Sequence, residues 1–207
     1  MSHLTLYTNP QSRGRIAHWM MEELGEPYET VWLDYASTMN APDYLAINPM
    51  GKVPALKHSD AIVTETAAIC AYLADQFPEK QLIPTNSVDR AAFFRWLFFA
   101  AGPLEQAVTA KSQGWAVTAE QEGFLGFGNY GKTISTLAAA LEHSPYIAGE
   151  QFSAADVYVG SHLGWGMLFN SIEKQPIFED YVARLHLRPA YLQTEQLNDA
   201  YLLAKIS

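Results

Sequence analysis

The stretch NPMGKVPAL, from Asn48 to Leu56, decides how the first half of the chain is interpreted. Its proline and glycine residues interrupt regular structure. The end of the stretch continues into two short β-prone segments, residues 52–57 and 60–64, which predict a hairpin. Glu65 and Thr66 then stand at the head of an apolar helix pattern. The stretch therefore predicts a loop that leads into a β-hairpin and a helix.

The residues before this stretch alternate between strand and helix patterns. Residues 3–8 and 28–33 predict strands, and between them an apolar face from Ser12 to Gly25 predicts a helix. The two strands of such a unit run parallel. Together with the hairpin and its helix, the order βαβ–ββα predicts an α/β N-terminal domain of thioredoxin size over residues 1–78.

Beyond residue 78 the character of the sequence changes. Two prolines and several polar residues within 77–87 predict a linker over 79–87, and strand patterns nearly vanish after it. An all-α C-terminal helical domain is therefore predicted over 88–207. Its first part predicts two long helices, over 88–114 and 118–143. Pro103 is expected to kink or end the first of them.

Local signals refine the second half. The glycine-rich residues 126–131 have no strand before them, so we interpret them as a helix irregularity or a loop rather than a nucleotide-binding motif. Ser153 and Asp156 have the spacing of a capping box and predict a helix start. Pro176 is expected to open a short helix, and the segment from Pro189 is expected to be a short helix with a tail.

Composition narrows the possible partners. The 207 residues include 13 basic and 22 acidic side chains, a net charge of −9, and no basic cluster that could follow a phosphate backbone. We therefore expect no nucleic-acid partner. No apolar run is long enough for a membrane span, and the N-terminal residues lack the pattern of a signal peptide. These features predict no membrane association and a cytoplasmic location.

The cysteine and histidine residues carry little chemistry. A single cysteine, Cys70, excludes an internal disulfide, a Cys-x-x-Cys redox pair and a cysteine-based zinc site. The six histidines are scattered without ligand spacing, so no metal site is predicted.

Several motifs, taken together and in order, resemble the cytosolic glutathione S-transferase superfamily in its bacterial, serine-type form. They cover almost the whole chain: Leu6-Tyr7, Pro10, Ser12-Arg13, Glu22 to Gly25, Asn48 to Leu56, Glu65-Thr66 and Phe152 to Asp156. The resemblance implies an enzyme that conjugates reduced glutathione, as co-substrate, to small hydrophobic electrophiles, and a homodimer. Two alternatives stay open, a glutathione-dependent peroxidase and a non-catalytic binding protein on the same scaffold.

The resemblance also implies which residues bind glutathione. A cis bond before Pro54 would turn the backbone of Val53 outward, where it pairs with the cysteinyl backbone of glutathione. The γ-glutamyl carboxylate would dock on the Thr66 amide and hydroxyl at a helix N-terminus, and Glu65 would accept the ammonium group. Lys52 could reach the glycyl carboxylate or backbone, although an exposed lysine in a loop is commonly just solvated.

Two hydroxyls compete for the role of stabilising the glutathione thiolate. Lowering a thiol pKa from about 8.5 by about two units takes roughly 2.7 kcal/mol, which a hydroxyl hydrogen bond and a helix N-terminus can approach together. Ser12, at the start of the first helix, matches the serine of serine-type transferases and is favoured. Tyr7 is the competitor, although Thr8 or Asn9 occupies the position that corresponds to the phenol of tyrosine-type enzymes.

The electrophile is expected to bind between the two domains, against the first long helix of the C-terminal domain. Phe98, Phe99 and Trp115 are candidates for an apolar wall, but aromatic residues at this density are also typical of a core.

Overall fold

The computed structural model describes residues 3–206. Its contacts divide the chain into two compact units. One contains the residues up to Lys80 together with those from Leu187 on, and the other is Gln81–His186. Among residues 3–206, none of the helices combines the length and apolarity that crossing a membrane requires.

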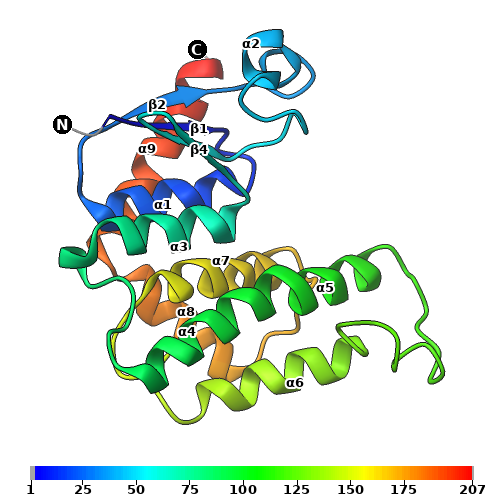
Figure 1. Ribbon diagram of the computed structural model, residues 1–207. Helices are drawn as coiled ribbons and strands as arrows, with labels where there is room; N and C mark the ends of the chain where they lie inside the picture. The colour runs from blue at the N-terminus through cyan, green and yellow to red at the C-terminus, as the bar shows by residue number, and fades with distance from the viewer. Residues whose placement is uncertain (1–2, 207) are drawn as a thin grey trace. The chain divides into compact units, whose positions relative to one another are not determined.

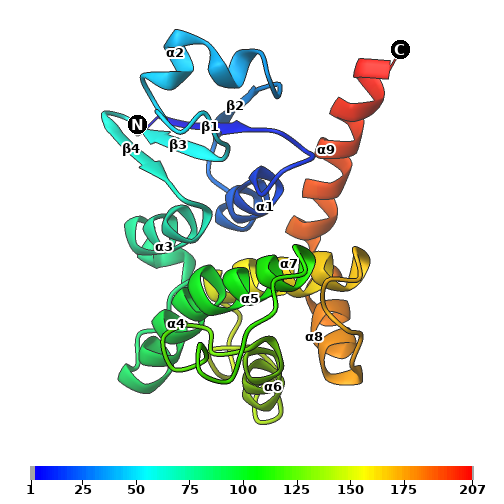
Figure 2. The ribbon, with the colours of Figure 1, turned by 90° about the vertical axis from the view of Figure 1, so that its right-hand side faces the viewer.

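The first unit is built on a four-stranded sheet with the strand order β2-β1-β3-β4. Its main elements are β1 (Leu4–Thr8), α1 (Gly14–Leu24), β2 (Tyr28–Trp32), β3 (Ala55–His58), β4 (Ala61–Thr64), α3 (Thr66–Gln76) and α9 (Pro189–Ile206). Helices α1 and α3 lie against one face of the sheet, and the segment with α2 (Pro42–Leu45) lies over the other (Figures 1 and 2). The predicted βαβ–ββα order is confirmed.

The sheet core follows the alternation of β1. Leu4 and Leu6 are 1% and 0% exposed. With Leu56 of β3, they belong to the buried apolar core on one face of the sheet. Strand β1 pairs parallel with β2 and antiparallel with β3, and β3 pairs antiparallel with β4. The two central strands, β1 and β3, therefore carry the register of the sheet.

The hairpin is shorter at its start than predicted. Strand β3 begins at Ala55 rather than residue 52, because Pro54 has no N–H group to donate to a ladder. At the other end, His58 belongs to the strand and pairs with Ala61, so the turn lies at Ser59-Asp60. The residues after β2, which carry no firm pattern, contain a 3-10 turn, η1 (Thr38–Asn40), before α2.

The last helix differs from the prediction in length and in grouping. The segment from Pro189 is one continuous helix rather than a short helix with a tail. It was expected to belong with the rest of 88–207, but its contacts group it with the sheet. The reason is tertiary: Tyr191 meets the Trp19 ring edge-on at 5.1 Å, and Tyr201 stacks on Trp32 at 4.3 Å.

Ion pairs add to this docking of α9. Arg188, just before α9, holds the carboxylate of Glu23 through two hydrogen bonds of 2.6 and 2.7 Å. Arg15 of α1 reaches Glu195 at 3.2 Å and also bonds to Asp199. The bidentate pair between Arg188 and Glu23 fixes the relative orientation of the two side chains as well as pairing their charges.

The second unit is helical, as predicted. Its helices are α4 (Ser87–Phe99), α5 (Glu105–Ser112), α6 (Tyr130–Leu141), α7 (Ala154–Leu168) and α8 (Pro176–His186). The first predicted long helix is broken by a π-helical segment, η3 (Ala100–Leu104), that contains Pro103. Proline removes one helix hydrogen bond, and a wider turn accommodates its ring. The predicted irregularity at Pro103 is therefore confirmed.

The second predicted long helix, over 118–143, is wrong for its first half. Only α6 is helical there, and the residues before it form turns. Three glycines lie within 118–129, and Gly128 has a φ of 60°, which ends any helix on that side. Asn129 then caps α6, because its side chain accepts the Lys132 N–H at 2.9 Å. The interpretation of 126–131 as a loop or irregularity is confirmed.

The capping box at the start of α7 is confirmed and extends further than predicted. The fully buried Asp156 carboxylate accepts hydrogen bonds from the N–H and hydroxyl of Ser153, from the Ile147 N–H and from the Tyr181 hydroxyl, at 2.8–2.9 Å. Burial and the charge of Asp156 raise the pKa of Tyr181, so its hydroxyl keeps the proton that it donates.

We predict that Asp156→Ala lowers the free energy of unfolding by about 3–5 kcal/mol, because it leaves several buried donors without an acceptor. Tyr181→Phe removes only one of these donors and should cost about 1 kcal/mol. Urea unfolding of both variants measures the difference. A cost for Asp156→Ala no greater than that for Tyr181→Phe would contradict this account.

His18 lies buried where α1 meets α9, with its Nδ1 atom 3.1 Å from Asn198 Nδ2. Burial lowers the pKa of His18, and the Asn198 hydrogen bond and the charge of Glu22 only partly oppose this. The unfolded state therefore takes up the proton first as the pH falls below about 6.5. The stability that depends on a neutral His18 is complete above that pH and is lost below it.

We predict that His18→Gln flattens the decrease in unfolding free energy between pH 7 and pH 5 relative to the unaltered protein. Urea titrations at several pH values measure this slope. His143→Gln, which removes an exposed histidine, is the matched control and should leave the slope unchanged. Equal slopes in all three proteins would show that the protonation of His18 has no influence on stability.

Candidate active site

The sheet topology brings three predicted segments to one edge. Tyr7 of β1 pairs with Ala55 of β3, and Ala55 pairs with Thr64 of β4. Because β3 runs antiparallel to both neighbours, its beginning lies beside the ends of β1 and β4. The turn after β1, the residues 52–54 before β3 and the start of α3 after β4 therefore meet at the same end of the sheet.

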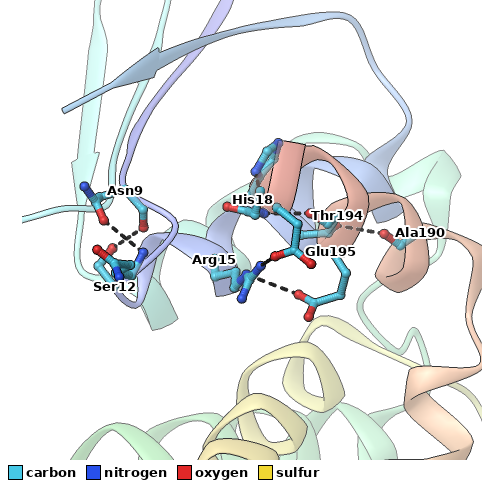
Figure 3. Close-up of polar contacts among 10 residues, drawn as sticks. Asn9, Ser12, Arg15, His18, Ala190, Thr194 and Glu195 are labelled. Atoms are coloured by element: carbon cyan, nitrogen blue, oxygen red, sulfur yellow. Dashed lines mark hydrogen bonds and ion pairs between the residues drawn. The ribbon is translucent and has the colours of Figure 1, made fainter. Parts of the chain in front are cut away.

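Ser12 lies in the turn between β1 and α1, where its hydroxyl has two partners (Figure 3). It donates to the Asn9 carbonyl at 2.7 Å and accepts the Gly14 N–H at 2.9 Å. Asn9 is itself fixed, because its side chain donates to the Leu33 carbonyl at 2.6 Å and accepts the Gln11 N–H at 2.9 Å. The turn thus holds a half-buried hydroxyl just before the start of α1.

Tyr7 lies in a different environment. Its ring is 5.6 Å from that of Tyr44 and packs against an apolar cluster that also contains Leu33, Met39 and Ala55. Burial, together with the charge of Glu29, raises the pKa of Tyr7. The phenol therefore stays protonated at neutral pH, and its ring helps to anchor the α2 segment on the sheet.

The backbone around Lys52 is held from behind. The Lys52 carbonyl accepts hydrogen bonds from the Tyr44 hydroxyl at 2.5 Å and from the Asn48 amide at 2.7 Å. Asn48 also accepts the Met50 N–H at 3.1 Å. The peptide bond between Val53 and Pro54 is cis, as predicted. The two hydrogen bonds from Tyr44 and Asn48 fix the Lys52 carbonyl. The Lys52 side chain itself is exposed to solvent.

Tyr44 and Asn48 were not identified from the sequence as supporting residues. Asn48, which is buried, is the first residue of the stretch from Asn48 to Leu56. An asparagine shortly before a glycine is a turn signal that could have identified it. Tyr44 carries no such signal, because it comes from a segment without a periodic pattern.

Glu65 and Thr66 open α3 in an unusual conformation. Glu65 is exposed and has a φ of 66° and a ψ of 118°, which is rare for a residue other than glycine. Its side chain does not cap the helix, and the first turn of α3 contains no acidic residue. Thr66 is buried at the first helical position. The unpaired N–H groups and the dipole at this helix start favour an anion.

The three candidates for an apolar wall lie in different surroundings. Within the helical unit, Phe98 is 68% exposed, and Phe99 packs edge-on against Trp96 at 5.2 Å. Trp115 lines a cavity beside α5. Cys70 is fully buried, and burial raises the pKa of its thiol to about 12, so it stays an inert core residue as expected.

Within the described residues, no group of three or more histidine, cysteine, aspartate or glutamate side chains is placed to hold a metal ion.

Comparisons with known proteins agree with this arrangement. Residues 13–76 match the model of the glutathione S-transferase N-terminal domain. Glutathione S-transferase GstA of Escherichia coli O157:H7 is 31% identical over 166 residues, which cover 78% of this chain and 82% of that protein. The chain belongs to the glutathione S-transferase family. The motif-based resemblance, and with it the prediction of an enzyme of this family, is confirmed.

Two solved structures extend the likeness of this transferase over nearly the whole chain. The bacterial transferase BphK, solved as a ternary complex, has a TM-score of 0.77 and 32% identity and covers 94% of this chain and 99% of its own. A theta-class transferase from Xanthomonas axonopodis pv. citri, solved with glutathione bound, has a TM-score of 0.72 and 29% identity, with coverages of 94% and 97%.

The turn that holds Ser12 depends on the absence of a side chain at Gly14. A Cβ atom there would lie 2.2 Å from Thr8 Oγ1 and 2.9 Å from Ser12 Oγ. Gly14→Ala should therefore lower the free energy of unfolding by about 1–3 kcal/mol through this overlap. In the background of Thr8→Ala, which removes the closest atom, the same change should cost less. Chemical unfolding of the four proteins in this double-mutant cycle measures the coupling.

Gly102 offers a matched control for the glycine change. A Cβ atom at Gly102 meets nothing within 4 Å, so Gly102→Ala should cost nothing. If Gly14→Ala lowers the free energy of unfolding equally in the original and the Thr8→Ala backgrounds, the close approach to Thr8 does not determine the geometry of the turn.

Proposed function

We propose that this transferase conjugates reduced glutathione, as co-substrate, to small hydrophobic electrophiles. The observation that carries the proposal is the convergence of Ser12, residues 52–54 and the Glu65-Thr66 helix start at one edge of the sheet. The glutathione bound in the solved Xanthomonas relative supports the same co-substrate here. Family membership also supports a homodimer in the cytoplasm as the working form.

Each segment offers what one part of glutathione requires. The start of α3 attracts the γ-glutamyl carboxylate to the Thr66 amide and hydroxyl, and the exposed Glu65 carboxylate accepts the ammonium group. The backbone of Val53 pairs with the cysteinyl residue as an added strand. Lys52, with its carbonyl fixed by Tyr44 and Asn48, lies where it can reach the glycyl end. Opposite charges on the site thus match both ends of the tripeptide.

Ser12 is the residue that we assign to the thiolate. Its hydroxyl accepts the Gly14 N–H, which polarises the O–H bond and makes the hydroxyl a better donor. When glutathione binds, the Ser12 proton turns from the Asn9 carbonyl to the sulfur, which it stabilises as the thiolate. Tyr7 is the weaker candidate, because its ring serves the packing between β1 and the α2 segment.

We predict that Ser12→Ala lowers kcat/KM for conjugation of a chloronitrobenzene by about 10–100-fold, because a hydrogen bond to an anion is worth about 1.5–3 kcal/mol. The pKa of bound glutathione, followed through thiolate absorbance against pH, should rise in parallel. Glutathione affinity measured by calorimetry should change little, since Ser12 contacts the sulfur only.

Tyr7→Phe is the matched control, because it also removes one hydroxyl. It should leave both kcat/KM and the pKa of the bound thiol close to their original values. The reverse pattern, with Tyr7→Phe inactive and Ser12→Ala unaffected, would make Tyr7 the activating residue. A protein whose thermal unfolding shows no shift with glutathione would instead be a non-catalytic member of the family.

A further inference from the structure

The turn that carries Ser12 is bonded to the chain just after β2. The Leu33 carbonyl accepts the Asn9 side-chain amide at 2.6 Å. Two residues further on, the Tyr35 hydroxyl donates to the Gln11 carbonyl at 3.1 Å. The Asn9 carbonyl in turn accepts the Ser12 hydroxyl at 2.7 Å. A displacement of the chain after β2 is therefore transmitted to the position of Ser12.

The ladder of the sheet reaches only the beginning of this segment. Strand β2 ends at Trp32, and a turn follows in which Ala36 has a φ of 57°. The Leu33 N–H still donates to the Thr8 carbonyl at 2.9 Å. Beyond Leu33, contacts made by side chains have to hold the segment in place.

Helix α9 supplies two such contacts. It lies alongside α1 in the same unit (Figure 2). The Tyr201 ring stacks on the Trp32 ring, with the ring centroids 4.3 Å apart and an angle of 15° between the planes. Lys205, one turn later, forms an ion pair with Asp34. Both contacts fall on the residues directly before and after Leu33.

The ring stack is the stronger of these two contacts. The side chains of Asp34 and Lys205 are both 42% exposed, so water and salt screen their charges. Trp32 and Tyr201 are half-buried, and their stacked faces exclude water from each other. His18 of α1 meets the Trp32 ring edge-on at 5.5 Å. Trp32 is thus held between α1 and α9, and Tyr201 holds it from α9.

The same helix also holds the other side of the Ser12 turn. The Arg15 N–H donates to the Ser12 carbonyl at 3.1 Å. The Arg15 guanidinium group pairs with Glu195 and Asp199 of α9 (Figure 3). The turn therefore lies between two segments that α9 fixes, one through Arg15 and one through Tyr201.

We infer that Tyr201 is a positioning residue for the reaction of this transferase. Its stack on Trp32 fixes the chain after β2, and this chain sets the direction in which the Ser12 hydroxyl meets the thiol. A hydrogen bond weakens steeply when it is misdirected, so a small shift of the turn reduces the stabilisation of the thiolate. The inference rests on the proposed role of Ser12, through which Tyr201 acts.

The pKa of bound glutathione, followed through thiolate absorbance against pH, tests the inference. Tyr201→Ala should raise this pKa by about half a unit, a roughly threefold loss of acidity, and lower kcat by a similar factor. KM for glutathione should change little, because the start of α3 that we assign to the γ-glutamyl group is left intact. Tyr201→Phe keeps the flat ring and should match the unaltered protein.

Tyr201→Leu keeps apolar bulk but removes the flat ring, so it should show the same rise as Tyr201→Ala. It replaces the alanine variant if that protein folds poorly, which circular dichroism measures.

Tyr72→Ala is the matched control for the loss of a ring. Tyr72 is also half-buried, and it meets the His58 ring edge-on at 5.8 Å. His58 pairs with Leu4, at the opposite end of the sheet from the Ser12 turn. Tyr72→Ala should therefore lower the thermal unfolding temperature without shifting the pKa of bound glutathione. A shift in Tyr201→Ala no larger than in this control, or an equal shift in Tyr201→Phe, would overturn the inference.

A double-mutant cycle separates the inference from the proposed function. In the Ser12→Ala background, Tyr201→Ala should cause no further rise in the pKa of bound glutathione, because it acts only through Ser12. Additive effects would show that Tyr201 acts by another route, which contradicts the inference and leaves the proposed function intact. If Ser12→Ala alone leaves the pKa unchanged, the proposed role of Ser12 fails, and the inference fails with it.

Discussion

The pairing of β1 with one parallel and one antiparallel neighbour is the constraint on which the candidate active site depends. Because β3 runs against β1 and β4 runs against β3, residues far apart in sequence come together at one edge of the sheet. A shift of one residue in this register would turn every side chain of the moved strand to the other face. The buried Leu4, Leu6 and Leu56 oppose such a shift, since it would expose them. The apolar core therefore sets the geometry of the polar site.

A second layer of hydrogen bonds holds the loops that the sheet brings together. Asn9 fixes the turn of Ser12 to the end of β2 through the Leu33 carbonyl. Tyr44 and Asn48 fix the Lys52 carbonyl just before the cis bond. All three supporting side chains are buried, where a hydrogen bond is strong and its loss is costly. Loops held in this way present backbone groups in a defined position without needing regular structure of their own.

The features that the sequence predicted well are those written locally. The capping box of Ser153 and Asp156 lies within four residues, so its geometry follows from spacing alone. The cis bond before Pro54 was implied by the resemblance of its flanking motif to the family, and that motif is also local.

Some of what the sequence did not predict depends on distant partners, and some depends on local breaks in a helix pattern. The length and grouping of α9 come from Trp19, Trp32 and Glu23, more than 150 residues earlier in the chain. Residues 118–129 have helix-compatible composition, and only the glycines and the cap at Asn129 show where the helix must begin. Tyr44 acts through its hydroxyl bond to the Lys52 carbonyl and its ring contact with Tyr7, and it lies in a segment without a periodic pattern.

The hydroxyl of Ser12 has one proton, and in this structure that proton belongs to the turn. Moving it to a sulfur gives up the 2.7 Å bond to the Asn9 carbonyl, worth about 0.5–1.5 kcal/mol, and gains a bond to an anion, worth about 1.5–3 kcal/mol. The net gain falls short of the roughly 2.7 kcal/mol that lowering a thiol pKa by two units requires. On the proposed role of Ser12, the dipole of α1 would supply the remainder. Thiolate stabilisation would then be shared between this one side chain and the helix that begins just after it.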